Sequence, residues 1–139
     1  MLTAQGRIAV SAELVERALS GRIVTAPDGT EHLTPKLITF FEGAAGFPWH
    51  SQAAWIGASL AGRHGLDVAE AADAAADVFR SDLYRLHLRP AGAILPGAFE
   101  KLEGALAQPT AVPAERGQLI LPADRFFDAR IFDLTVPAR

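Results

Sequence analysis

Residues 51–89 read SQAAWIGASLAGRHGLDVAEAADAAADVFRSDLYRLHLR and decide the expected fold. The stretch predicts a helix over 51–64, which a glycine ends, and a second helix from an Asp67 cap to about Ser81. Residues 83–89 then alternate apolar and polar side chains, as a half-buried strand does. Two helices joined by a short turn and followed by a strand are the outline of a winged helix-turn-helix.

The residues before this stretch predict a further helix and a hairpin. Ser11 is placed to cap a helix that Gly21 ends. Strong turn residues at 27–29 separate two short β-prone runs, 23–25 and 30–33, and predict a hairpin. We expect this hairpin to pair with the predicted strand in a small antiparallel sheet.

A third helix of the core is expected between Thr34, as its cap, and Gly43, where it stops. Proline at the first helical position favours this start, because its missing N–H would have no helical partner there. The helix carries four large apolar side chains and is therefore predicted to form the core of the domain. These side chains are Leu37, Ile38, Phe40 and Phe41.

The tail after Pro90 is expected to add a helix over 96–108, a loop over 109–117 and two strands, QLIL and RIFDLTV, at 118–121 and 130–136. The predicted fold is α+β, with a winged-helix-like three-helix core, a small antiparallel sheet and a C-terminal α/β tail. The predicted domains are a winged-helix-like domain with an N-terminal helix at residues 1–90 and an extension at 91–139 that packs on it.

The composition limits the chemistry. The chain has 139 residues, half of them hydrophobic, with a net charge of −3 and no cysteine. Disulfides, zinc–thiolate sites and thiol nucleophiles are thereby excluded. The weak negative charge gives no general attraction to nucleic acid or anionic membranes. No secretory pattern or apolar stretch of about 20 residues is present, so we expect a cytoplasmic protein without a membrane span.

No catalytic, cofactor-binding or metal-binding residue is predicted. Nucleotide-binding loops and the common hydrolase motifs are absent from the sequence. His50 and Ser51 are neighbours, but adjacent residues rarely point at each other, and Ser51 is better placed as a helix cap. A small enzyme with a site built by convergence stays open as a second alternative, involving His50, His87 or the acids between Asp124 and Asp133.

The helix from Asp67 tests the DNA-binding alternative. Its outward face carries Glu70, Asp73 and Asp77, which a polyanion would repel. This disfavours DNA, although a transcriptional regulator stays an alternative. Its contacts would come from the 27–29 turn and three basic residues, Arg80, Arg85 and Arg89.

Trp55 and Arg63 share the outward side of the preceding helix. An outward tryptophan needs a cover, which is either the chain's own tail or another protein. The predicted partner-binding residues are therefore Trp55, Arg63, Glu70, Asp73 and Asp77.

Four segments resemble the winged-helix module of bacterial protein-lysine methyltransferase-like proteins: VTAPDGTEHLTPKLITFF at 24–41, FPWHS at 47–51, GLD at 65–67 and LYRLHLRP at 83–90. The resemblance covers about residues 23–90 and contains no catalytic residue. The first 22 residues and the tail after Pro90 lie outside this resemblance. The family's catalytic domain has no counterpart in this chain.

The resemblance implies a non-catalytic accessory domain that packs on a protein partner or an adjacent catalytic domain. The predicted function is thus a regulatory or protein-interaction module associated with an S-adenosylmethionine-dependent methyltransferase. A homodimer is left open.

Overall fold

The computed structural model describes residues 9–34 and 39–136, which fall into two compact units. The units comprise residues 1–40 and 41–139, and each is described by itself. The division therefore lies at residue 40 and not at the predicted position, Pro90. Residues on both sides of Pro90 belong to the second unit because buried leucines of the tail, Leu119 and Leu121, pack against the aromatic side chains of Phe47 and Trp49.

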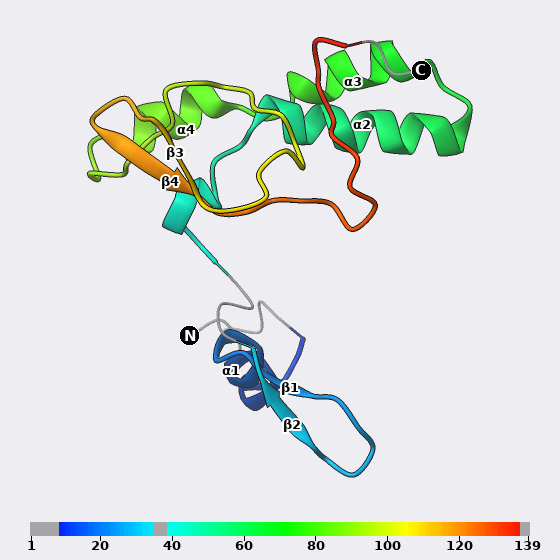
Figure 1. Ribbon diagram of the computed structural model, residues 1–139, viewed down its shortest axis with the longest axis vertical. Coiled ribbons are helices and arrows are strands. Elements are labelled where there is room, and N and C mark those ends of the chain that lie inside the picture. The colour runs from blue at the N-terminus through cyan, green and yellow to red at the C-terminus, as the bar shows by residue number, and fades with distance from the viewer. Residues whose placement is uncertain (1–8, 35–38, 137–139) are drawn as a thin grey trace. The chain divides into compact units, whose positions relative to one another are not determined.

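The described part of the first unit contains a helix and a hairpin (Figure 1). Its elements are α1 (Ala12–Leu19), β1 (Arg22–Val24) and β2 (Glu31–Leu33), and the two strands pair antiparallel. The side chain of Ser11 accepts a hydrogen bond from the backbone N–H of Leu14 at 3.3 Å, which confirms the predicted cap. In the turn, the carboxylate of Asp28 accepts bonds from the N–H and hydroxyl of Thr30. The predicted helix and hairpin are confirmed.

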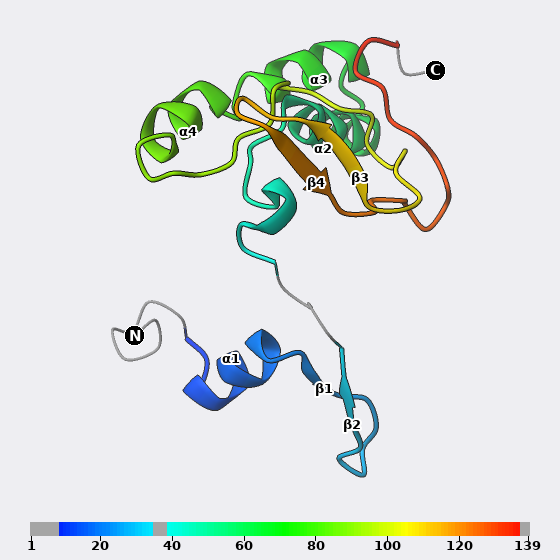
Figure 2. The same ribbon diagram turned by 60° about the vertical axis from the view of Figure 1, so that its left-hand side comes forward.

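Two helices of the second unit run alongside each other (Figures 1 and 2). They are α2 (His50–His64) and α3 (Val68–Ala76). Gly65 ends α2 with a left-handed φ of 67°, which glycine adopts without steric cost. Asp67 caps α3 by accepting the N–H of Glu70 at 2.9 Å. Both predicted helices are confirmed, although α3 is shorter than expected.

Small side chains let α2 and α3 approach closely. A Cβ atom at Gly57 would lie 2.5 Å from the carbonyl oxygen of Ala71 and 2.6 Å from the Cβ of Ala75. The buried alanines Ala54, Ala72 and Ala76 form the contact beside it, and Phe132 and Leu134 of the tail pack against them. The alanine-rich sequence thus builds a thin helix pair that the tail covers.

A second core joins the remaining elements. The strands β3 (Thr110–Pro113) and β4 (Gln118–Leu121) pair antiparallel, and Leu119 and Leu121 of β4 are buried. They meet the side chains of Phe47 and Trp49, whose ring centroids lie 4.8 Å apart in an edge-to-face arrangement. This core also includes Ala44 of the 3₁₀ turn η1 (Glu42–Ala44).

The predicted strand at 83–89 is wrong, because this segment belongs to helix α4 (Ser81–Leu88). Its inward side consists of Ser81 and Arg85, which are buried, and Tyr84 and Leu88, which are half-buried. These four positions have helical spacing, i, i+3, i+4 and i+7. The alternation of apolar and polar residues suggested a strand. The helical pattern was not apparent in the sequence because two of the four inward residues, Ser81 and Arg85, are polar.

The expected core helix after Thr34 is not found where the structure describes the chain. Residues 35–38, which include Leu37 and Ile38, lie outside the described residues. Phe40 and Phe41 are 68% and 79% exposed and are not helical. They therefore do not form the core. The expected pairing of the hairpin with residues 83–89 is also wrong, since that segment is a helix.

Three predictions for the tail need correction. Residues 96–108 form no helix, since Gly104 adopts a left-handed φ of 82° and a Cβ there would lie 2.6 Å from the carbonyl oxygen of Arg130. The expected loop at 109–117 contains β3, which pairs with the predicted QLIL strand. The expected strand at 130–136 is reduced to a single bridge, in which Phe132 pairs with Glu103.

The α+β class is confirmed by these helices and two antiparallel hairpins. None of the helices in the described part of the chain has the length and apolar character needed to cross a membrane.

Candidate functional site

An apolar groove lies on the second unit between α2, the start of α3 and the tail segment 126–132. Its volume is about 540 Å³. The helices contribute Trp55, Ala58, Ser59 and Val68 to its lining. The tail contributes Phe126, Phe127, Asp128, Arg130, Ile131 and Phe132.

Trp55 is the aromatic platform of this groove. Its ring stacks on that of Phe126, with centroids 5.0 Å apart and planes 23° from parallel. The side chain nevertheless stays 40% exposed. The tail therefore covers only part of the tryptophan, which faces outward as its position on the helix predicts.

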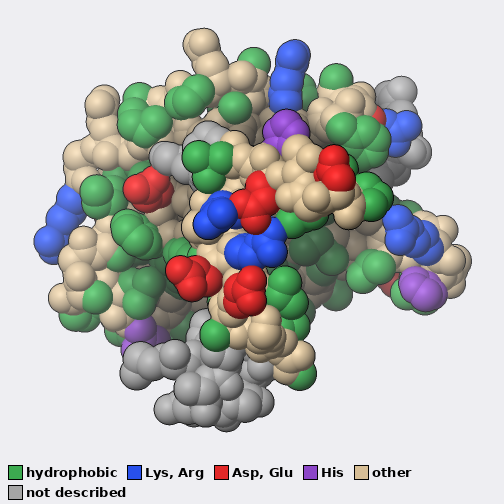
Figure 3. Space-filling view, turned by 90° about the horizontal axis from the view of Figure 1, so that it is seen from below, with side chains coloured by type: hydrophobic (Ala, Val, Ile, Leu, Met, Phe, Trp, Pro, Cys, Tyr) green, Lys and Arg blue, Asp and Glu red, His purple; other side chains and the backbone are tan. Residues whose placement is uncertain are grey.

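Apolar side chains extend this platform into solvent. Phe127 is fully exposed, with a relative accessibility of 104%, and Ile131 is 59% exposed. Exposed hydrophobic residues are common on protein surfaces, but aromatic and aliphatic side chains gathered around a concave site are typical of binding surfaces. On the face seen in Figure 3, which does not identify the groove, hydrophobic side chains are spread among charged side chains of both signs.

The groove carries one acidic and one basic side chain. Arg130 Nε lies 3.6 Å from Asp128 Oδ2, and the arginine side chain is 85% exposed. The backbone N–H of Arg130 also donates to Asp128 Oδ1 at 3.1 Å. Because the pair is long and open to solvent, it contributes little to stability and leaves both groups available to other partners.

The structure brings only one of the predicted partner-binding residues into the groove. Arg63, Glu70, Asp73 and Asp77 are exposed, but none of them lines it. The sequence interpretation missed the aromatic residues of the tail that face Trp55. The paired phenylalanines at 126–127 were the available signal.

A polar cluster lies inside the second unit, around the start of α2. Ser51 is 0% exposed, and its hydroxyl donates to Glu103 Oε1 at 2.7 Å while accepting the backbone N–H of Lys101 at 3.1 Å. The Lys101 ammonium donates to Glu103 Oε2 at 2.5 Å and also binds the carboxylate of Asp124. Ser51 therefore does not cap α2 as predicted, because Trp49 holds that position and the hydroxyl bonds to the tail.

His50 and Ser51 do not form a nucleophile and base. The His50 imidazole Nε2 lies 2.9 Å from the hydroxyl oxygen of Ser81, and both serine side chains are buried. Both serine hydroxyls are hydrogen-bonded inside the unit, so both contacts join elements of the fold. The described residues also contain no group of three or more histidines and carboxylates able to hold a metal ion.

Arg85 joins α4 to the tail from a buried position. Its guanidinium donates to Glu115 Oε1 at 2.5 Å and to the carbonyl oxygen of Ala98 at 2.8 Å. The guanidinium carbon lies 4.3 Å from the ring centroid of Phe99, in a cation–π contact. Arg85, like Arg89, binds Glu115 and is therefore part of the fold, which opposes the DNA-contacting role considered above.

The hydrogen bonds of the Glu115 carboxylate should make the stability of the second unit sensitive to acid. Hydrogen bonds from Arg89 and then Arg85 lower its pKa from 4.5 to about 2. A lowered pKa contributes stability above pH 4.5 that is lost as the pH falls toward 2. We expect the unfolding free energy of Glu115→Gln, measured by urea titration, to fall less steeply across this window than that of the wild type. Equal slopes would contradict this assignment.

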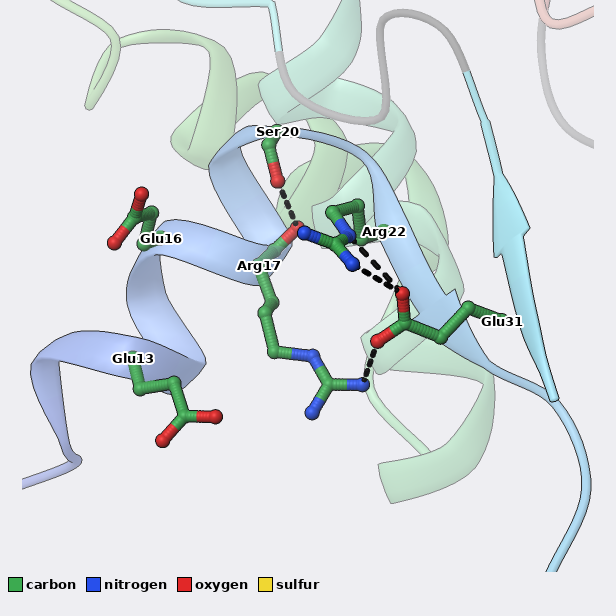
Figure 4. A pocket seen from close by; sticks show the side chains of 6 residues that line it. All are labelled: Glu13, Glu16, Arg17, Ser20, Arg22 and Glu31. Atoms are coloured by element: carbon green, nitrogen blue, oxygen red, sulfur yellow. Dashed lines mark hydrogen bonds and ion pairs between the residues drawn. The ribbon is translucent and has the colours of Figure 1, made fainter. Parts of the chain in front are cut away.

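The first unit contains a hollow of about 210 Å³ that is lined by charged side chains (Figure 4). Arg17 and Arg22 converge on opposite oxygens of the Glu31 carboxylate, each at 2.6 Å. The hydrogen bond from Arg22 is the main cause that lowers the pKa of Glu31. The Arg17 pair joins α1 to the hairpin, and the Arg22 pair links the two strands of the hairpin. Glu13 and Glu16 line the same hollow.

The resemblance to methyltransferase-associated winged helices stays a prediction. No family model, no curated protein and no solved structure matches the chain.

Proposed function

We propose that this chain is a non-catalytic protein-interaction module that docks a protein in the groove around Trp55. The observation that carries the proposal is the stacked pair of Trp55 and Phe126, beside which Phe127 projects fully into solvent. Tryptophan and other aromatic side chains in a pocket contribute most of the binding energy in many protein interfaces.

The apolar surface of the groove that stays in water is a source of binding energy. Full burial of an exposed phenylalanine side chain contributes about 1.5–3 kcal/mol. Phe127 alone would therefore contribute roughly this amount before the costs of association are subtracted. A partner that covers the groove gains this energy without rearranging the core.

Two further observations support a binding role over catalysis or DNA binding. The buried hydroxyls of Ser51 and Ser81 bond to Glu103 and His50 and join parts of the fold. The carboxylate-bearing residues of α3, Glu70 and Asp73, are exposed. The association with an S-adenosylmethionine-dependent methyltransferase rests on the sequence resemblance alone and stays a prediction.

Site-specific photo-crosslinking tests the proposal. We expect benzoylphenylalanine in place of Phe127 to capture a discrete protein in cells of the source organism. The same probe in place of Phe41 is the matched control, because Phe41 is also an exposed phenylalanine of this unit but does not line the groove.

The captured protein is then purified, and its affinity is measured against the wild type and Trp55→Ala. We expect the substitution to weaken binding at least about tenfold, as loss of an aromatic anchor does. Equal capture at both probe positions, or unchanged affinity of Trp55→Ala, would contradict a docking site at the groove.

A further inference from the structure

We infer that the protein docked in the groove is a second copy of this chain, in a two-fold arrangement that places each Phe127 in the groove of the other copy. This inference rests on the docking function proposed above and names the partner. A projecting aromatic ring and an apolar hollow occur on the same patch, so the patch is complementary to itself.

The shape of the patch satisfies the requirement of a two-fold interface. In such an interface the same surface of both copies takes part, and a contact between residue i and residue j occurs twice. Phe127 is both a lining residue and the most exposed aromatic side chain of the groove. A cavity of about 150 Å³ is enough to hold benzene, and the groove, at about 540 Å³, has room for a phenyl ring.

The charges of the groove favour the same partner. It holds one carboxylate, Asp128, and one guanidinium, Arg130, whose mutual contact is long and exposed. A two-fold axis that passes beside this pair can bring Asp128 of one copy toward Arg130 of the other, and the reverse. The surface therefore matches its own charge pattern, and a strongly acidic or strongly basic partner would leave one of the two groups opposed by like charge.

The exposed area sets the strength of the expected dimer. Phe127, Ile131 and the uncovered part of Trp55 offer roughly 400 Å² per copy, given the areas that aromatic side chains bury. Two copies would bury roughly 800 Å² of this apolar surface, to which the polar rim adds, and this area is below the roughly 1,200 Å² of stable specific interfaces and typical of weak, transient ones. We therefore expect a reversible dimer with a dissociation constant of roughly 1–100 μM.

Sedimentation velocity from about 1 μM to about 500 μM tests the inference. We expect the wild type to pass from monomer to dimer and Phe127→Ala to require at least about tenfold higher concentration. Since the Phe127 side chain is fully exposed in the isolated chain, its removal leaves the fold intact, which a urea titration checks. Phe41→Ala is expected to dimerise like the wild type.

Two results would overturn the second-copy inference: a wild type that stays monomeric over this range, or a dimer that Phe127→Ala does not weaken. Neither result decides the docking function by itself. A monomeric chain that crosslinks another protein at position 127 retains the docking function with a different partner. If crosslinking at position 127 does not exceed that at position 41, the docking function fails as well.

Discussion

Replacing Glu103 by alanine is expected to lower the free energy of unfolding of the second unit by about 3 kcal/mol. The Glu103 carboxylate is 4% exposed and accepts bonds from the Ser51 hydroxyl and the Lys101 ammonium. Its removal leaves a buried hydroxyl without its acceptor and a largely buried ammonium with only Asp124 as partner. Loss of one member of a buried polar cluster exposes the desolvation cost of the others.

A urea titration followed by tryptophan fluorescence measures this change. Trp49 is a suitable reporter because its buried ring faces the Lys101 ammonium at 6.0 Å. Asp82→Ala serves as the control, since Asp82 forms an ion pair with Arg80 in which both side chains are more than half exposed. We expect the control to unfold close to the wild type. Glu103→Ala unfolding like this control would show that the cluster is not needed for the fold.

The second large effect is expected at the contact between α2 and α3, where Gly57→Ala should destabilise the unit by about 2 kcal/mol. The new Cβ would lie 2.5 Å from a backbone oxygen of α3, so the helices must separate. Overpacking of this kind costs about 1–3 kcal/mol, and it outweighs a gain of up to about 1 kcal/mol in helix propensity.

Gly62→Ala on the same helix is the matched control. No atom lies within 4 Å of a Cβ at Gly62, so only the helix propensity changes there. We expect this variant to be more stable than the wild type by about 0.5–1 kcal/mol. The two glycine variants should therefore shift the urea midpoint in opposite directions. A stabilised Gly57→Ala would contradict the close approach of the helices.

Elements marked by local signals could be predicted from the sequence. Caps at Ser11 and Asp67, the turn at 27–29 and the left-handed Gly65 act through neighbouring residues, and the helices and hairpin that they delimit are confirmed. The QLIL strand was also found, because Leu119 and Leu121 lie on one side of it.

Elements held by distant partners could not be predicted in this way. Arg85 is buried in α4 because Glu115, thirty residues further along, binds its guanidinium. The sequence gives no indication of this pairing, and an arginine is normally placed on the outside. The burial of Glu103 likewise depends on a distant partner, since Ser51 lies 52 residues earlier in the chain.

The candidate site was predicted in part. The helical position of Trp55 indicated an outward tryptophan, and the tail was one of its expected covers. The groove itself depends on Phe126 and Phe127, which lie in an irregular segment without helical or strand spacing. Residues without periodic spacing give no sign of the side chains that they pack against. The sequence alone therefore did not predict that these two phenylalanines lie beside Trp55.

Amide chemical shifts of the ¹⁵N-labelled chain, recorded while the protein is concentrated, test most directly whether proteins meet at the groove. We expect the signals of the Trp55 indole N–H, of Ser59 and of residues 126–132 to shift, while those of the β1–β2 hairpin stay unchanged. Self-association that moves the hairpin signals and leaves the indole of Trp55 in place would contradict this expectation.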